Sequence, residues 1–252
     1  MMSADAPIIV FTGPTIGKEE VEAVLPAICL PPAAQGDVIG AVLRFNPAVI
    51  LIIDGTFQNE PAVRHKEILW ALDRGVAVCG AASMGALRAA ELWKYGMRGF
   101  GQIYRWYRRY PLLPDDAVAV LHAPADLGSA ALTHALVDII QTVKSACRNG
   151  AIASDIAPTL CKSARRLNFR ERTLEGVVAA ACAKNPEIDK EELTGALLNS
   201  WTAQKAKDAK VALHALRNQA ISDLIGNNPV PPFVMTTAFR RDLEHSGFNL
   251  GS

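Results

Sequence analysis

Residues 47–54 read Pro-Ala-Val-Ile-Leu-Ile-Ile-Asp, an apolar run that ends on an acid. A run without polar alternation is typical of a strand buried on both faces, as in the centre of a parallel sheet. Helical patterns separate this run from shorter apolar runs, and the order strand, helix, strand, helix predicts an α/β fold: a parallel sheet with flanking helices. The other strands of this part are expected at 7–12, 27–30 and 76–79.

The second half of the chain has a different pattern. A further short strand is predicted at 115–122, and from about residue 127 the sequence is Ala-rich and helical. We therefore expect an α/β core domain over 1–126 and an α-helical C-terminal region over 127–252. The helices of that region are expected near 127–148, 151–166, 172–184, 189–222 and 236–244.

Composition excludes several classes of protein. The 252 residues carry a net charge of +1, which gives no general attraction to nucleic acid. No apolar run is long enough for a membrane helix, and the N-terminus lacks the features of a signal peptide. The five cysteines form no Cys-x-x-Cys pair, so neither a metal site nor a disulfide framework is expected. We expect a cytoplasmic protein without a cofactor, a membrane segment or a nucleic-acid partner.

The most informative polar residue is Ser83, within Gly-Ala-Ala-Ser-Met-Gly at 80–85. This stretch follows an apolar strand and precedes a helical pattern, so it resembles a loosened nucleophile elbow with Ala81 in place of the first Gly. A strand-to-helix turn exposes a hydroxyl and supplies the free N–H groups of a helix start. The alternative is that Ser83 only caps the helix.

The segment 81–86, Ala-Ala-Ser-Met-Gly-Ala, also resembles the nucleophile segment of Clp-type serine proteases, which have a crotonase-like site. Downstream, the segment 118–124 resembles the strand that carries their catalytic His. Here His122 follows Ser83 by 39 positions, which is longer than the protease pattern and requires an insertion over 96–114. The resemblance concerns the site and not the substrate.

Other candidates lie at the same expected edge of the sheet. Asp54 and Gly55 follow the central strand, and Gly13 follows the first strand. Asp54 is expected either to orient a His or only to end the strand in a turn. Gly55 is a candidate oxyanion donor together with the turn amides of Met84 and Gly85.

The helix after the central strand carries a second polar group near its start. His65 is a rival of His122 as the base, and Lys66 is a candidate partner for a carboxylate or thiocarboxylate. Thr56 lies between the strand and this helix and is a candidate substrate contact. The alternative for the helix residues is an ordinary solvated surface.

Residues 98–110 interleave arginines with aromatic residues, a composition typical of protein interfaces. The same composition suits single-stranded nucleic acid, but the nearly neutral chain favours a protein contact. The alternative is an ordinary amphipathic helix.

Taken together, four stretches resemble the TfuA-like family over residues 1–140. They are Gly13-Pro14-Thr15, then 54–57 with 65–69, then Gly-Ala-Ala-Ser-Met-Gly-Ala-Leu-Arg-Ala-Ala-Glu-Leu at 80–92, and Asp-Asp-x-Val-Ala-Val-Leu-His at 115–122. The resemblance implies an accessory protein of a YcaO-type enzyme in peptide backbone thioamidation. It further implies a ubiquitin-like sulfur carrier protein as a partner, whose thiocarboxylate is hydrolysed to release sulfide.

Three hypotheses about function remain open at this point. The first is a hydrolase that attacks the thiocarboxylate through Ser83. The second is a non-catalytic scaffold or allosteric activator of the YcaO enzyme, and the third is a Ser hydrolase acting on an unrelated small ester or peptide. The sequence leaves open whether the helical region forms a homo-oligomer.

Overall fold

The computed structural model describes residues 6–56, 60–122, 131–183, 187–224 and 230–248. These residues form two compact units. We call Met1–Leu112 with Ala206–Ser252 the sheet unit and Leu113–Lys205 the helical unit. The C-terminal segment therefore belongs with the sheet, although its sequence pattern groups it with the helical region 127–252.

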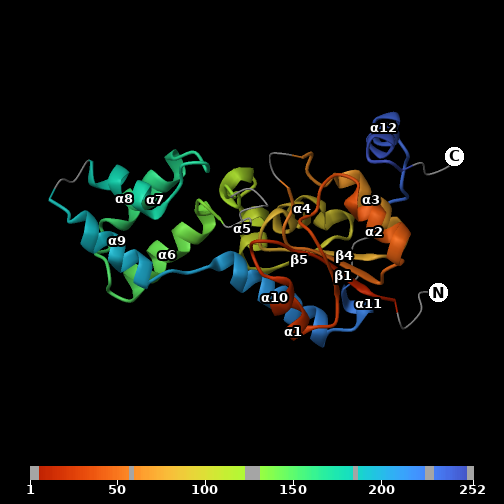
Figure 1. Cartoon of the computed structure of the whole chain (residues 1–252), viewed down its shortest axis with the longest axis horizontal. Coiled ribbons are helices and arrows are strands. Elements are labelled where there is room, and N and C mark those ends of the chain that lie inside the picture. Colours follow the sequence, from red (N-terminus) through yellow and green to blue (C-terminus); the bar gives the residue numbers. More distant parts are fainter. Residues whose placement is uncertain (1–5, 57–59, 123–130, 184–186, 225–229, 249–252) are drawn as a thin grey trace. The chain divides into compact units, whose positions relative to one another are not determined.

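The sheet unit is built on five parallel strands in the order β2-β1-β3-β4-β5 (Figure 1). The α/β fold with a parallel sheet is thereby confirmed. The continuous apolar run at 47–54 forms the middle strand, as its pattern predicts. The strands are β1 (Ile8–Phe11), β2 (Ile28–Leu30), β3 (Val49–Ile52), β4 (Ala77–Ala81) and β5 (Arg98–Phe100).

The strand order reverses between β1 and β3, because the chain passes from β1 outward to β2 and then back across β1. In open parallel sheets the loops at such a reversal leave a crevice beyond the carboxyl ends of the strands, where ligands bind. The loops after β1, β3 and β4 all lie at this edge, since the three strands are parallel neighbours.

Helices cover both faces of the sheet (Figure 1). α2, α3 and α4 lie on one face, and α1 and α10 lie on the other. No helix within the described ranges is both long and apolar enough to cross a membrane. The helices of the sheet unit are α1 (Lys18–Val24), α2 (Asp37–Phe45), α3 (His65–Asp73), α4 (Met84–Leu92), η1 (Trp93–Tyr95), α5 (Gly101–Arg109), α11 (Ile221–Leu224) and α12 (Thr237–His245); α10 (Gln204–Asn218) enters it from the helical unit.

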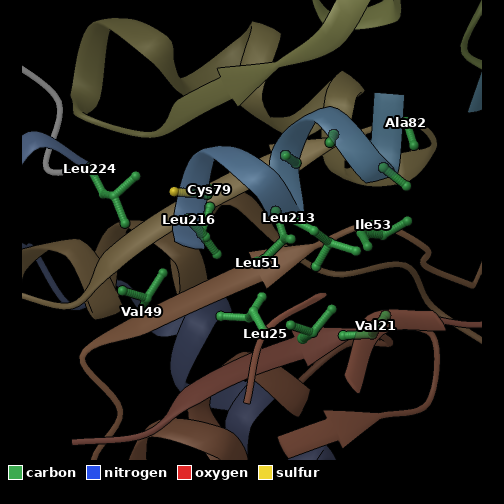
Figure 2. Close-up of a cluster of buried hydrophobic side chains, with 14 of the residues drawn as sticks. Val21, Leu25, Val49, Leu51, Ile53, Cys79, Ala82, Leu213, Leu216 and Leu224 are labelled. Atoms are coloured by element: carbon green, nitrogen blue, oxygen red, sulfur yellow. The ribbon is translucent and has the colours of Figure 1, made fainter. Parts of the chain in front are cut away.

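Alternate residues of the middle strand form the hydrophobic core beneath α10. Val49, Leu51 and Ile53 point to the same face, where α10 contributes Leu213 and Leu216 (Figure 2). All five side chains are at most 4% exposed. This burial explains why the segment from Ala206 onward belongs to the sheet unit rather than to the helical one.

The helical unit has a charged group at its centre. Arg172 is 1% exposed and donates to the carbonyl oxygens of Ala164, Leu167 and Asp116, and its Nη2 lies 3.1 Å from Asp116 Oδ2. A buried guanidinium is tolerated only when its donors are satisfied in this way. The helices of this unit are η2 (Asp115–Ala117), α6 (Leu136–Arg148), α7 (Ala157–Arg166), α8 (Leu174–Cys182) and α9 (Lys190–Asn199).

The prediction of a strand at 115–122 is wrong. Residues 115–117 form the short helix η2, and His122 makes only an isolated bridge to Ala131. The physical reason is local: the N–H of Ala117 bonds to the carbonyl of Pro114, and Arg172 holds Asp116. The fifth strand is instead β5, whose Arg-Gly-Phe sequence contains no apolar run.

The prediction of one continuous helix at 189–222 is also wrong. It is divided into α9, α10 and α11. The chain leaves helical geometry around Thr202, whose N–H donates to the buried Thr142 hydroxyl at 3.0 Å. The helix predicted from residue 127 begins only at Leu136, and residues 127–130 lie outside the described part.

The first turn of α4 lies directly on the backbone of β3 and β4. A Cβ at Gly85 would overlap the carbonyl of Ile52, and a Cβ at Gly80 would overlap the carbonyl of Gly85. The N–H of Gly85 also points to the Ile53 carbonyl at 3.4 Å. Only glycine permits this approach, so these two residues fix where α4 begins.

A buried carboxyl joins the starts of two helices. Glu67 is 1% exposed; its Oε2 accepts from the N–H groups of Gly36 and Val38 at α2, and its Oε1 accepts from Arg64 at α3. Burial raises the pKa of Glu67 to about 7, against the opposing effect of the three N–H donors. The negative charge of Asp37 nearby acts in the same direction as burial.

We predict that Gly85→Ala lowers the free energy of unfolding by about 3 kcal/mol or more, because the added methyl group meets backbone that cannot rotate away. Gly195→Ala is the matched control, since Gly195 lies within α9 and a Cβ there meets nothing within 4 Å. That control should gain roughly 0.5–1 kcal/mol from helix propensity. Equal urea midpoints for Gly85→Ala and the wild type would contradict the close contact.

We predict that the free energy of unfolding falls as the pH rises from 4.5 to about 7. A carboxyl whose folded pKa lies above its ordinary value of 4.5 stabilises the fold fully below pH 4.5, and this contribution is lost as the pH passes the folded value. The loss is at most about 3 kcal/mol. Urea unfolding at several pH values across this range measures the change in stability. Glu67→Gln should remove the pH dependence, whereas Glu22→Gln, at an exposed residue, should leave the pH dependence unchanged. A wild-type stability that rises over this range would contradict the prediction.

Candidate functional site

Ser83 lies at the N-cap of α4, directly after β4. The residue before it, Ala82, has a φ of +64°, and the N–H of Ser83 bends back to the Ala81 carbonyl at 2.7 Å. A positive φ at a residue with a side chain is uncommon and is found at functional turns. The chain therefore makes the sharp strand-to-helix turn that the sequence predicts for residues 80–85.

The hydroxyl of Ser83 does not cap the helix. Ser83 occupies the N-cap position, but its side chain makes no capping hydrogen bond. Among the hydrogen bonds described here, none uses its Oγ, and the residue is 8% exposed. The structure thus leaves the hydroxyl without the helix-capping contact that the purely structural interpretation requires.

Asp54 is occupied by the loop after β1. Its Oδ1 accepts from the Thr15 hydroxyl at 2.6 Å and its Oδ2 accepts from the Thr15 N–H at 3.0 Å. Asp54 is 3% exposed, and Gly13 lies against it and Pro32, since a Cβ at Gly13 would be 2.6 Å from Pro32 Cγ. Asp54 therefore joins the loops after β1 and β3. Thr15 serves this contact and does not cap α1, which begins after Gly17.

Gly55 and Met84 bring the loops after β3 and β4 into contact. A Cβ at Gly55 would lie 2.8 Å from Met84 Cγ and 3.0 Å from the carbonyl of Ala33. Thr56 donates its N–H to that same carbonyl. The close packing leaves Met84 only 3% exposed, with Gly55 and Thr56 partly exposed beside it.

The expected oxyanion donors differ in what they contact. The N–H of Gly85 already points to the Ile53 carbonyl. The N–H groups of Gly55 and Met84 take part in none of the turn and loop hydrogen bonds of the described residues. Of the three donors that the sequence suggested, these two fit an oxyanion role better.

His65 is paired with α4 at a distance from the serine turn. Its Nε2 lies 2.8 Å from Glu91 Oε2, and Arg88 Nη1 donates to the same oxygen at 2.7 Å. Burial opposes the charge of Glu91, but the His65 hydrogen bond and Arg88 outweigh it and lower its pKa. Glu91 follows Ser83 by eight positions, about 12 Å along a helix axis. The structure therefore does not bring His65 to Ser83.

Lys66 contacts the C-terminal segment. Its Nζ donates to the Val234 carbonyl at 3.2 Å and lies 5.3 Å from the centre of the Phe233 ring. The N–H of Phe233 in turn donates to Asp73, at the other end of α3. Lys66 thus holds residues 233–234 along this helix, a role for which its sequence neighbourhood carried no signal.

His122 lies in the helical unit, whereas Ser83 lies in the sheet unit. Residues 98–109, within the insertion expected over 96–114, form β5 and α5. The pairing of Ser83 with His122 stays a prediction. Ala123 and Pro124, which complete the protease-like motif, lie outside the described residues, as does Phe57.

The cysteine nearest to the serine turn is not a competing nucleophile. Cys79, four positions before Ser83, is fully buried, and burial raises the pKa of its thiol to about 12. In the described ranges, no three His, Cys, Asp or Glu side chains gather as a metal ion would require. The serine turn itself offers a hydroxyl beside the backbone N–H groups at the start of α4.

Sequence reasoning placed the loops correctly but missed the partners within them. Asp54 with Thr15, and His65 with Glu91, are contacts between positions that lie 39 and 26 residues apart. Sequence spacing gives no signal for such pairs. The loops themselves could be found because each follows an apolar run at the same end of a parallel strand.

Comparison with protein families gives a match to the TfuA-like protein model over residues 54–173. Comparison with curated proteins gives no match. The matched segment begins at Asp54 and contains the serine turn, His65 and His122, whereas Gly13 precedes it. Residues 54–173, which carry most of the candidate site, are thus similar to the TfuA-like family.

Proposed function

We propose that this protein assists a YcaO-type enzyme in peptide backbone thioamidation by releasing sulfide from a thiocarboxylated, ubiquitin-like sulfur carrier. Similarity to the TfuA-like family indicates the accessory role beside a YcaO enzyme. The hydrolysis of the carrier and the part of Ser83 in it are our proposal.

The observation that supports the proposal most is the geometry of the serine turn. Ser83 follows a residue with positive φ, stands at the start of α4 and is not used as a cap. A helix start stabilises negative charge that develops beside it. Gly55, which packs against Met84, places a second backbone N–H in the same loop cluster.

The reaction is an acyl transfer followed by hydrolysis. Ser83 Oγ attacks the thiocarboxylate carbon, and its proton passes through a base to the departing sulfur. The C–S bond breaks and hydrosulfide (HS−) departs, so that the carrier is bound to Ser83 through an ester. Water then cleaves the ester, which returns the Ser83 hydroxyl and leaves the carrier with a carboxylate. The N–H groups of Met84 and Gly55 would bind the oxyanion in both steps.

The sequence offers His122 and His65 as the base, and His65 would have to leave Glu91 and move toward Ser83 to serve. Its contact with Glu91 makes His65 the weaker of the two candidates. His122 belongs to the segment that resembles the catalytic strand of Clp-type proteases. Replacing each His by Ala separates the two candidates, since only the base is required for sulfide release.

A second candidate function is supported by the burial of the same residue. Ser83 is 8% exposed, and Asp54 and His65 are occupied by Thr15 and Glu91. This arrangement suits a non-catalytic scaffold or allosteric activator of the YcaO enzyme, in which the loops shape a binding surface.

We predict that Ser83→Ala lowers the rate of sulfide release from a thiocarboxylated carrier by roughly a thousand-fold or more, since the nucleophile is lost. The measurement follows sulfide and the mass of the carrier together. Ser163→Ala is the matched control, because Ser163 is also 8% exposed but lies in α7 of the helical unit.

Undiminished release by Ser83→Ala would contradict the nucleophile. No release by the wild type, together with faster YcaO turnover when the protein is added, would support the activator instead. The two functions can be distinguished in one series of assays. Sulfide release is measured without the YcaO enzyme, and YcaO turnover is measured with it.

A further inference from the structure

The segment 93–112 is strongly basic within a nearly neutral chain. It contains Lys94, Arg98, Arg105, Arg108 and Arg109 and no Asp or Glu. The whole chain has a net charge of only +1, so the remainder is net negative. The positive charge is therefore concentrated on η1, β5 and α5.

Helix α5 divides this segment into an inner and an outer face. Ile103 and Tyr107 are 0% and 5% exposed and pack inward, while Arg105 and Arg109 are exposed. Residues four apart on a helix are neighbours, so the two arginines stand side by side. Asp208 of α10 accepts from the N–H of Ile103 at 2.6 Å, which fixes the start of the helix.

The same segment also carries exposed apolar and aromatic side chains. Leu112 is 96% exposed, Tyr110 is 54% exposed and Tyr95 is 44% exposed. The guanidinium of Arg109 lies 5.6 Å from the centre of the Tyr110 ring. We call Lys94, Tyr95, Arg105, Arg109, Tyr110 and Leu112 the basic-aromatic face.

No carboxylate of the described chain forms an ion pair with the basic residues of this segment. Like charges at positions i and i+4 destabilise a helix, so Arg105 and Arg109 reduce the stability of α5. Arginines that lower the stability of a helix and have no ion-pair partner in the described chain fit a surface that binds a negatively charged molecule.

The face suits a protein better than a single-stranded nucleic acid. Nucleic-acid bases stack on successive open aromatic rings, and the ring of Trp93 in this segment is not open. The ring of Trp93 is covered by the Arg108 guanidinium, 3.3 Å from its centre, and Lys94 Nζ lies 5.8 Å from it. A fully exposed Leu112 beside Tyr110 suits an apolar side chain from a peptide.

We propose that the basic-aromatic face binds an acidic segment of a partner protein, whose carboxylates meet Arg105 and Arg109 and whose apolar side chains meet Tyr110 and Leu112. Arginine and tyrosine are the residues on which binding energy concentrates at protein interfaces. The inference does not depend on the reaction proposed at Ser83.

The test uses a fluorescent peptide in which Glu alternates with Leu, and a second peptide with Gln at every Glu position. The full chain should bind the Glu peptide, lose affinity as salt is added, and bind the Gln peptide weakly. The double variant Arg105→Glu/Arg109→Glu should bind the Glu peptide at least about ten-fold more weakly. Arg44→Glu, an exposed arginine in the last turn of α2, is the matched control and should bind like the wild type.

Several outcomes would overturn the inference. One is failure of the wild type to bind the Glu peptide at low salt, and another is equal binding by the double variant. Tighter binding of an oligothymidylate would assign the face to nucleic acid. Self-association of the wild type that the double variant abolishes would assign it to a second copy of the chain. Because both arginines are exposed, the double variant should fold, and Arg105→Gln/Arg109→Gln repeats the test without added negative charge.

Discussion

The contact between the first turn of α4 and the backbone of β3 and β4 determines the geometry of the candidate site. Gly80 and Gly85 allow the helix to start directly on the strands, without the space that a Cβ needs. The chain must then reverse within three residues, and Ala82 adopts a positive φ to do so. Ser83 is thereby held at the carboxyl edge of the sheet, after the strand that neighbours β3, and β3 borders the reversal of strand order.

The acidic residues around this edge mainly accept hydrogen bonds that join neighbouring elements. Asp54 holds the loop after β1 through Thr15, and Glu67 joins the starts of α2 and α3. Glu91 receives both His65 and Arg88. These carboxyls connect the loop after β1 and the starts of α2 and α3 to their neighbours, and stabilisation of an oxyanion requires backbone N–H groups that are held in place. The hydroxyl of Ser83 remains outside these networks, which distinguishes it from the polar residues around it.

Local patterns were sufficient for the parallel sheet but not for long-range partners. The apolar run at 47–54 predicted the middle strand, and the glycines at 80 and 85 marked the turn. β5 escaped prediction because Arg-Gly-Phe has no strand signal, and a strand was wrongly placed at 115–122, where Asp116 is instead bound to Arg172. The return of α10 to the sheet depends on burial of Leu213 and Leu216, which helical periodicity alone cannot assign to a particular face.

The most direct test of the account is the chemical identity of the intermediate at Ser83. Protein mixed with a thiocarboxylated carrier, quenched rapidly and analysed by mass spectrometry should carry the carrier acyl group as an ester on the peptide that contains Ser83. The Ser83→Ala protein should carry none and should release no sulfide. An acyl group on a cysteine, or full sulfide release by Ser83→Ala, would contradict the account.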